Sequence, residues 1–161
     1  MAQSVAAMQK DCSKKEKKEK LMLSQISIYT ENKKGAMRRI TELMQQQDIN
    51  ILGSVNNDSA EYGIVRMVVS HPQKAVQALE DNGYMCKLTD VLGIEIQDRV
   101  GELNRLLAAL EDSNINVNYM YLSFNRESGS PVMVFHTNDI AEVEECLMAK
   151  GFCGLKALRE S

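Results

Sequence analysis

Two short polar segments, each ending in a glycine that precedes an amphipathic helix pattern, contain the residues best suited to binding a ligand. Gly35 follows the segment ENKK, and Gly101 follows the segment QDRV. A helix N-terminus carries free backbone N–H groups and a partial positive charge, which suit a carboxylate. Glycine lets the backbone approach a ligand closely or take a positive φ. Both segments are therefore candidate anion sites; the alternative is that each glycine only shapes a tight turn.

An asparagine follows each of these helix patterns, where the next strand pattern begins. These residues are Asn50 and Asn116. An amide side chain offers both hydrogen-bond donors and an acceptor, so it could hold the ammonium and the carboxylate of a free amino acid. We expect each asparagine to lie beside the preceding glycine loop. The alternative is a residue that ends the helix, because Asn tolerates the left-handed conformation.

Charged residues differ between the two loops. Asp98 and Arg99 precede Gly101, whereas Asn32 and Lys33 stand near the corresponding places before Gly35. Asp98 could accept hydrogen bonds from an ammonium group. A solvated ion pair between Asp98 and Arg99 is the alternative. The acidic and basic groups together favour the second loop as the better ligand site.

The elements that must position these residues occur twice. Gly35 and Asn50 correspond to Gly101 and Asn116 at an offset of 66, and the later halves correspond at an offset of 68. Each copy shows a strand pattern, a helix, two strands, a second helix and a last strand. The sequence thus predicts an α+β protein of tandem ferredoxin-like βαββαβ units, with antiparallel sheets and helices on one face.

The same patterns predict where the units begin and end. We expect a flexible charged tail over 1–22, a first unit over 23–90 and a second unit over 91–161. Residues 56–59 read as a loop, and residues 117–124 read as a strand. Because no turn cluster separates 84–89 from 92–96, the last strand of the first unit should run almost directly into the second unit. The other face of each sheet then needs cover from a second unit or chain.

Charge and hydropathy exclude several functional classes. The net charge is −3, and the first 20 residues hold six lysines and three acidic groups, which leaves 13 basic and 19 acidic residues in the body. An acidic body argues against a nucleic-acid surface, and the basic tail reads as a solvated leader. No run of 18 apolar residues and no signal-peptide pattern exist. We therefore expect a cytoplasmic protein with no membrane partner.

Catalytic and metal-binding patterns are missing from the sequence. The four cysteines form no CxxC pair, only two histidines exist, and no nucleophile elbow, phosphate loop or HExxH motif occurs. Tyr119 and Tyr121 lie two residues apart on one face of a strand. Packing in the core or an interface is a simpler role for these tyrosines than stacking against RNA bases. These observations predict no cofactor, no enzyme activity and reduced, mostly buried thiols. Because a unit of about 65 residues is small for one core, we also expect a homodimer.

The segment ENKKGAMRRITELMQQQDINI and its repeat QDRVGELNRLLAALEDSNINV resemble the ACT domain, a βαββαβ module that binds amino acids and regulates metabolic enzymes. The resemblance covers residues 24 to about 156, and the chain is similar to stand-alone tandem-ACT proteins that bind amino acids. Lys34 and Val100 stand where the family usually has proline, so both loops should be looser. Met37 replaces a common leucine at similar volume.

The resemblance implies a non-enzymatic, amino-acid-binding regulatory protein whose ligand lies between the loop and helix start of one unit and the second strand of another. In the second unit it implies a site of Asp98, Arg99, Gly101, Glu102 and Leu103, largely through backbone, with Asn116 and Val117. A weaker site in the first unit would use Asn32, Gly35, Ala36 and Met37, with Asn50 and Ile51. A separate metabolic enzyme or regulator would read the ligand signal.

Two alternative functions stay open. One is a dimerisation scaffold whose ligand site has degenerated. The other is a ferredoxin-like enzyme similar to acylphosphatases, in which Arg99 and Asn116 would serve one active site.

Overall fold

The computed structural model describes residues 22–57 and 62–155, so the predicted N-terminal tail up to residue 21 lies outside the described residues. The first unit contains six elements, in the order β1 (Leu23–Glu31), α2 (Ala36–Gln46), β2 (Ile51–Asn57), β3 (Tyr62–Val69), α3 (Pro72–Asp81) and the first part of β4 (Met85–Glu95). The second unit continues from β4 through α4 (Glu102–Asp112), β5 (Tyr119–Phe124), β6 (Pro131–His136), α5 (Ile140–Ala149) and β7 (Cys153–Gly154). The predicted tandem βαββαβ order is confirmed.

Strand β4 belongs to both units. Residues 85–91 pair with β1, whereas residues 92–95 pair with β6. The sheet order is β2-β3-β1-β4-β6-β5, with β7 also paired to β4, and every pair is antiparallel. The predicted direct passage from one unit to the next is therefore confirmed. The predicted boundary between residues 90 and 91 falls inside a continuous strand, so the units share a rigid connection.

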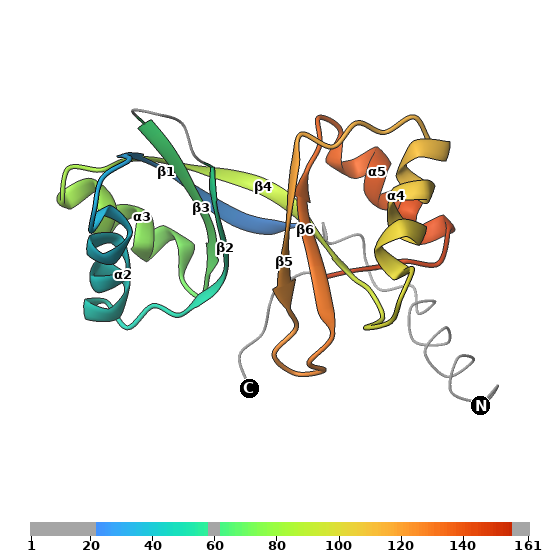
Figure 1. Cartoon of the computed structure of the whole chain (residues 1–161), viewed down its shortest axis with the longest axis horizontal. Helices are drawn as coiled ribbons and strands as arrows, with labels where there is room; N and C mark the ends of the chain where they lie inside the picture. The colour runs from blue at the N-terminus through green and yellow to red at the C-terminus, as the bar shows by residue number, and fades with distance from the viewer. Residues whose placement is uncertain (1–21, 58–61, 156–161) are drawn as a thin grey trace.

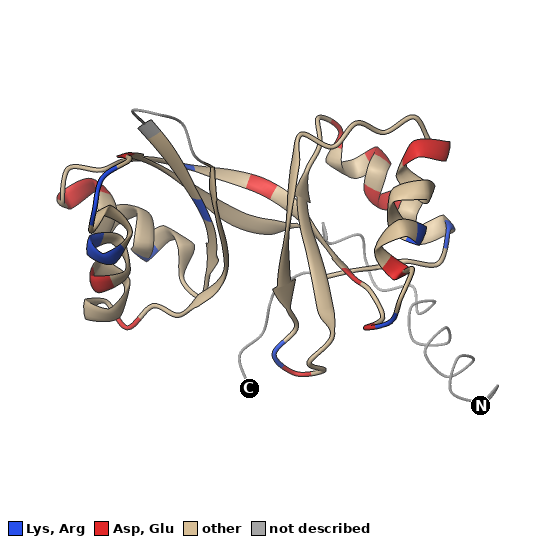
Figure 2. Cartoon of the chain, in the orientation of Figure 1, with Lys and Arg blue, Asp and Glu red and all other residues tan. Residues whose placement is uncertain are grey.

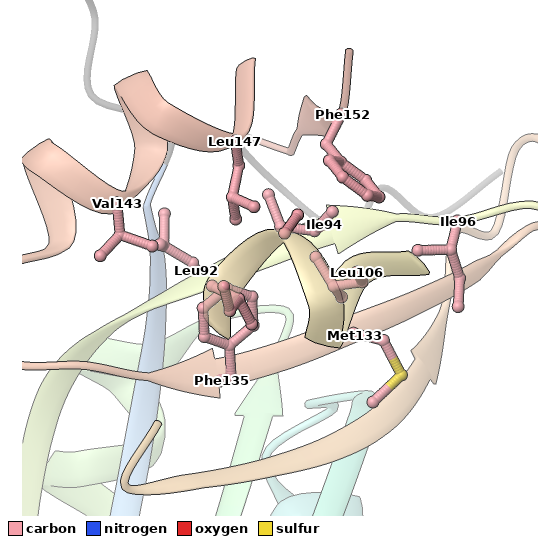
Figure 3. Close-up of a cluster of buried hydrophobic side chains, with 11 residues drawn as sticks. Leu92, Ile94, Ile96, Leu106, Met133, Phe135, Val143, Leu147 and Phe152 are labelled. Atoms are coloured by element: carbon pink, nitrogen blue, oxygen red, sulfur yellow. The ribbon is translucent and has the colours of Figure 1, made fainter. Parts of the chain in front are cut away.

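The helices lie on the two outer sides of the molecule, α2 and α3 on unit 1 and α4 and α5 on unit 2 (Figure 1). In α2 the buried residues Ala36, Ile40 and Met44 recur every four positions and form one apolar face. This face packs on Ile26 and Met67 of the sheet. The equivalent core of unit 2, shown in Figure 3, joins Leu106 of α4 and Leu147 of α5 to Leu92, Ile94, Met133 and Phe135 of the strands.

The opposite faces of the two sheets pack against each other between the units. This inner layer contains Leu23, Leu52, Val68, Val91, Tyr121, Val132 and Val134. Gly53 lets β2 approach β5 closely, because a Cβ there would lie 2.9 Å from Oγ of Ser123. The chain's own second unit thus supplies the cover that the sequence analysis expected for the open sheet faces.

Polar side chains fix the two units together within this layer. Gln25, which is completely buried, donates from Nε2 to Oη of Tyr119 at 2.7 Å and accepts from Oη of Tyr121 at 3.0 Å. The Arg66 guanidinium lies over the Tyr119 ring, 4.2 Å from its centroid. Burial raises the pKa of Tyr121 far above its ordinary value. Tyr119 and Tyr121 therefore serve packing between units, as their spacing predicted.

Several element ends differ from the sequence-based expectation. Asn56 and Asn57 belong to β2, where they pair with β3, because cross-strand pairing prevails over their local turn preference; the rest of the predicted loop, residues 58–59, lies outside the described residues. Strand β5 begins at Tyr119 and not at residue 117. Helix α5 is capped by Asp139, whose side chain accepts from the backbone N–H of Glu142 at 3.2 Å. The three cysteines within the described ranges are half-buried and form no disulfide with one another.

Candidate functional site

Both candidate loops end in a glycine with left-handed backbone geometry. Gly35 has a φ of 82° and Gly101 a φ of 92°, and each is the N-cap of the following helix. An L-residue adopts such angles only with strain, so the sequence needs glycine at both places. Neither N-cap makes a side-chain capping hydrogen bond. Both helix starts therefore keep backbone N–H groups that no N-cap side chain accepts.

Backbone hydrogen bonds show which N–H groups the loops keep available. The first helical bonds are donated by Arg39 to Gly35 and by Arg105 to Gly101, at 3.1 and 2.9 Å. The N–H groups of Ala36 and Glu102 close the turn by donating to the carbonyls of residues 33 and 99. The N–H groups at positions 37 and 38, and at 103 and 104, precede the first helical donor and are the ones that could face an anion.

In unit 2 the partner of Arg99 is Glu102 and not Asp98. Arg99 Nε donates to Oε1 of Glu102 at 2.7 Å, and Arg105 Nε donates to Oε2 at 3.1 Å. Burial raises the pKa of the Glu102 carboxyl, but the hydrogen bonds from both arginines outweigh it, so the pKa lies below its ordinary value. Within the described residues Asp98 is exposed and forms no ion pair. The expected Asp98–Arg99 pair is thus wrong, because the helix start brings Glu102 closer to the guanidinium.

The loop of unit 1 keeps the basic residues but lacks the buried acid. Lys33 and Arg39 stand at the positions of Arg99 and Arg105, whereas Ala36 stands at the position of Glu102. Lys33 pairs instead with Glu31, and both side chains are 59 % exposed. The hydrogen bond from Lys33 lowers the pKa of Glu31. Arg39 lies over the loop, since its Nη1 would be 3.6 Å from a Cβ on Gly35.

The two loops consequently differ in net charge. Residues 31–39 contain four basic side chains and one acidic side chain, which gives +3. Residues 97–105 contain two of each, which gives zero. Figure 2 shows basic residues gathered at the start of α2, and both signs at the start of α4. Unit 1 therefore offers a positive surface, whereas unit 2 offers a balanced one.

Asn50 and Asn116 do not lie beside the glycine loops of their own units. In unit 2 the chain before α4 meets one end of β6, where Ile96 donates to the carbonyl of Pro131 at 3.0 Å. The chain after α4 meets the other end, where Asn118 donates to the carbonyl of His136 at 3.0 Å. Unit 1 repeats this arrangement along β3, with Glu31 opposite Tyr62 and the carbonyl of Asn50 accepting from Ser70. The expected proximity is wrong, because the helix joins two parallel strands on either side of a third and runs back along the full strand length, so its two ends lie far apart.

The asparagines also do not take the left-handed backbone conformation that was their alternative role. That conformation belongs to Asp48 and Asn114, both with a φ of 54° and both two residues earlier. Asn116 and Val117 line a shallow hollow of about 370 Å³ at the end of α4, together with Leu107, Leu110, Glu111, Asn114 and Ile115. Each unit thus presents its glycine loop at one end of its first helix, which we call the loop group. At the other end lies the asparagine group, which is Asn50 with Ile51 in unit 1 and Asn116 with Val117 in unit 2.

Two residues of the loops were missed by the sequence reasoning. Arg39 and Arg105 both follow the loop glycine by four positions and both reach back towards the loop. Their recurrence at the 66-residue offset is a signal that could have found them.

The acylphosphatase-like alternative needs Arg99 and Asn116 at one site, but a single chain places them at opposite ends of α4, and Arg99 already donates to Glu102.

Metal-binding clusters and membrane-spanning helices are absent from residues 22–57 and 62–155. These residues hold no group of three or more His, Cys, Asp and Glu side chains arranged to bind a metal ion. In the same part of the chain, no helix combines the length and apolar character that crossing a bilayer requires.

The chain is similar to known proteins in both sequence and fold. A family model described as an ACT domain pair matches residues 21–156. The chain is similar to the crystal structure of protein BT0572 from Bacteroides thetaiotaomicron, with 30 % identity and a TM-score of 0.77 over 86 % of this chain and 96 % of that one. No curated protein matches the sequence.

The fold is also similar to the ligand-free regulatory subunit of aspartate kinase from Thermus thermophilus. That likeness has 13 % identity and a TM-score of 0.59, and covers 79 % of this chain and 91 % of that one. The corresponding subunit from Thermus flavus has 17 % identity and a TM-score of 0.56, over 81 % and 91 %.

Proposed function

The chain belongs to the family of ACT domain pairs, and we propose that it is a non-catalytic regulatory protein that binds a free amino acid. The observation that carries this proposal is the repeated loop: α2 and α4 both begin at a left-handed glycine without a side-chain cap. A carboxylate at such a helix start is stabilised by free N–H groups and by the helix dipole. A separate metabolic enzyme or regulator would respond to the ligand-bound state of the protein.

The unit-2 loop suits a zwitterion better than the unit-1 loop. Its charges balance, so it can accept an ammonium group and a carboxylate together without a net electrostatic cost. Asp98 is exposed and could accept from the ammonium group, while the N–H groups at positions 103 and 104 could donate to the carboxylate. Glu102 would contribute by holding Arg99 and Arg105 in place, since the residue is 3 % exposed and its carboxylate already accepts from both.

A complete site needs the asparagine group of a second unit. One chain places Asn116 and Val117 at the far end of α4 from Gly101, so they can meet the Gly101 loop only when they come from another copy. We therefore propose that ligand lies between the loop group of one protomer and the asparagine group of its partner. The equivalent unit-1 groups, Asn32 to Met37 and Asn50 with Ile51, would bind more weakly and prefer an anionic ligand because of their net charge of +3.

A thermal-shift screen against the twenty amino acids tests this function. A ligand at 100 times its Kd that binds only the folded state adds about 2.7 kcal/mol, which raises the unfolding midpoint by several degrees. Gly101→Val should abolish the shift, because a β-branched residue resists a positive φ and would change the loop. Gly83→Val is the matched control, since Gly83 has a φ of 80° and equally open surroundings but lies outside both loops.

The outcomes separate the candidate functions. A shift that survives Gly83→Val and disappears in Gly101→Val supports the unit-2 site. A shift that survives Gly101→Val and disappears in Gly35→Val would move the site to unit 1. A flat screen with all twenty amino acids would contradict amino-acid binding and favour the dimerisation scaffold.

A further inference from the structure

The layer between the two sheets contains a basic side chain that no acidic group of the described chain neutralises. The guanidinium of Arg66 lies over the Tyr119 ring, and its Nε and Nη1 atoms are buried without a hydrogen-bond partner. Within the described residues Arg66 forms no ion pair. Buried polar atoms in folded proteins are nearly always hydrogen-bonded, and buried charges are nearly always paired. Arg66 therefore holds donors that a bound anion could use.

Arg66 belongs to a row of polar side chains that crosses the sheet of unit 1. Antiparallel register places Ser27 of β1 opposite Arg66, and Lys87 of β4 opposite Ser27. Directly opposed residues share one face of a sheet. This face lines the layer between the units, because Val68, two residues after Arg66, is buried there. Neighbouring strands lie about 4.8 Å apart, so the two basic residues start about 10 Å apart and flank the Ser27 hydroxyl.

The row lies where this layer opens to solvent. Along the same face of β1, Gln25 is completely buried, Ser27 is 8 % exposed and Tyr29 is 46 % exposed. Lys87 is exposed and Arg66 is half-buried. An anion could thus reach the row from solvent while one side of it rests against buried protein. Partial burial strengthens the attraction between an anion and the basic groups, because the local dielectric constant is lower than that of water.

Ser27 supplies a third donor between the two basic groups. Its Oγ accepts from Nε2 of Gln25 at 3.4 Å. Gln25 is itself held by Tyr119 and Tyr121 of unit 2. The hydroxyl hydrogen of Ser27 is then available to donate to a ligand. A guanidinium, a hydroxyl and an ammonium group on three neighbouring strands form a set of donors that suits phosphate oxygens.

Two carboxylates on the inner sheet faces are already bonded to other groups. Glu31, at the end of β1, pairs with Lys33. Glu95, at the end of β4, accepts hydrogen bonds from the loop between β5 and β6. Arg66 and Lys87 together give the row a charge of +2 that these carboxylates do not neutralise. A phosphate group carries about −1.5 to −2 at neutral pH, which matches this charge.

Unit 2 shows that the fold does not require a basic residue at this place. Arg66 corresponds to Val134 at the offset of 68, and Ser27 corresponds to Gly93 at the offset of 66. Gly93 and Val134 also lie opposite each other, and Val134 is completely buried in the apolar layer. An apolar residue therefore satisfies the same topology, whereas Arg66 leaves buried donors unpaired. A local departure from good packing of this kind points to a functional site.

We propose that Arg66, Ser27 and Lys87 form a binding site for a phosphate group, separate from both glycine loops, at the open end of the layer between the units. Rotation about the side-chain torsions of Arg66 turns its unpaired donors towards the phosphate oxygens. Lys87 donates from the other side, and the Ser27 hydroxyl donates from the sheet between them. Because Arg66 packs on Tyr119 of unit 2, bound phosphate should also stabilise the packing of the two units.

The test is a calorimetric titration of the full chain with inorganic phosphate at constant ionic strength. Arg66→Gln should raise the dissociation constant by about tenfold or more, because it removes a charge-assisted donor. Lys87→Gln should raise it by about threefold to tenfold, since Lys87 is exposed and its charge is screened. Lys33→Gln is the matched control, because it removes the same charge from the unit-1 glycine loop, and it should leave the dissociation constant within about twofold.

Thermal unfolding separates an effect on binding from an effect on folding. Phosphate at ten times its dissociation constant should raise the parent's unfolding midpoint by about 3–6 °C. Arg66→Met should lose this rise, yet without phosphate it should unfold at or above the parent's midpoint, because an apolar side chain replaces a buried charge without a partner. Lys87→Gln changes an exposed residue, so it tests the site in a chain that should keep the parent's fold.

Three results would overturn the proposal: no binding of phosphate, a dissociation constant that either Arg66→Gln or Lys87→Gln leaves unchanged, or loss of binding in Lys33→Gln. Glycerol 3-phosphate is titrated in parallel. Tighter Arg66-dependent binding of this ester would identify an organic phosphate as the ligand, and tighter binding of inorganic phosphate would identify the free ion. Amino-acid binding is measured separately with Gly101→Val, so failure of the proposed function would leave this site standing.

Discussion

The two glycine loops share one backbone and differ in how their charges are arranged. Each begins its helix with a left-handed glycine and carries basic residues at positions two before and four after it. In unit 2 those cations converge on the buried carboxylate of Glu102, and in unit 1 the same position is Ala36. The two copies therefore share the loop geometry, while the unit-2 loop is neutral and internally bonded and the unit-1 loop is positively charged.

This difference shows that a repeated backbone motif can carry two different arrangements of charge. The unit-2 loop and helix start expose the apolar side chains of Val100 and Leu103, whereas Lys34 and Met37 stand at the equivalent positions of unit 1. Electrostatic balance favours a zwitterion in unit 2, and net positive charge favours an anion in unit 1. The comparison can be tested by moving the acidic group from one loop to the other.

Removing the acid from unit 2 should have the largest effect. Glu102→Ala leaves Arg99 and Arg105 without their shared carboxylate and removes a favourable charge from the first turn of α4. We expect a loss of about 1–2 kcal/mol in the free energy of unfolding, because both guanidinium groups stay partly hydrated and need not remain buried. Urea denaturation of the parent and the variant measures this difference in the free energy of unfolding. An unchanged midpoint would mean that the ion pairs add nothing to stability.

Lowering the pH should remove from the parent protein the stabilisation that the ionised Glu102 provides. The pKa of Glu102 is lower in the folded chain than its unfolded value of about 4.3. Its contribution is therefore fully present above that value and is lost as the pH falls through the folded pKa. Parent and Glu102→Gln should differ in unfolding free energy at pH 7 and converge towards pH 3. Parallel curves over this range would contradict the assigned pKa shift.

Adding the acid to unit 1 should have the smallest effect. Ala36→Glu places a carboxylate in the first turn of α2, between Lys33 and Arg39, and reduces the loop charge from +3 to +2. We expect a gain of at most about 0.3–1 kcal/mol at low salt, because Ala36 is buried as Glu102 is, and the cost of desolvating the new carboxylate offsets part of its pairing with Lys33 and Arg39. Thermal unfolding at low and high salt measures the gain. A gain that does not decrease with salt would point to packing as its cause.

Several features of the fold could be predicted because they depend on local patterns. The periodic apolar positions of α2 and the recurrence of Gly35 at Gly101 were enough to predict tandem βαββαβ units. The missing turn between residues 84 and 96 was enough to predict the shared strand β4. The loop glycines could be singled out since a positive φ at a helix start selects glycine regardless of tertiary context.

The candidate site was harder to predict because its parts are brought together by packing. Asp98 and Glu102 are both within reach of Arg99 in sequence, and only the turn geometry and the burial of the α4 start select Glu102. Asn50 and Asn116 recur like the glycines, but recurrence does not state at which end of a helix a residue lies. Local sequence proximity was a poor guide to which side chains share a site.

The sequence by itself determined the duplication, the order of the elements and the glycine-started helices, since each follows from short-range periodicity and backbone preference. The tertiary structure decided the partner of Arg99, the separation of the asparagines from the loops, and the layer in which Gln25 joins Tyr119 and Tyr121 across 94 and 96 positions. Those outcomes depend on distances of a few ångströms between segments far apart in the chain. Only the packed sheets fix such distances.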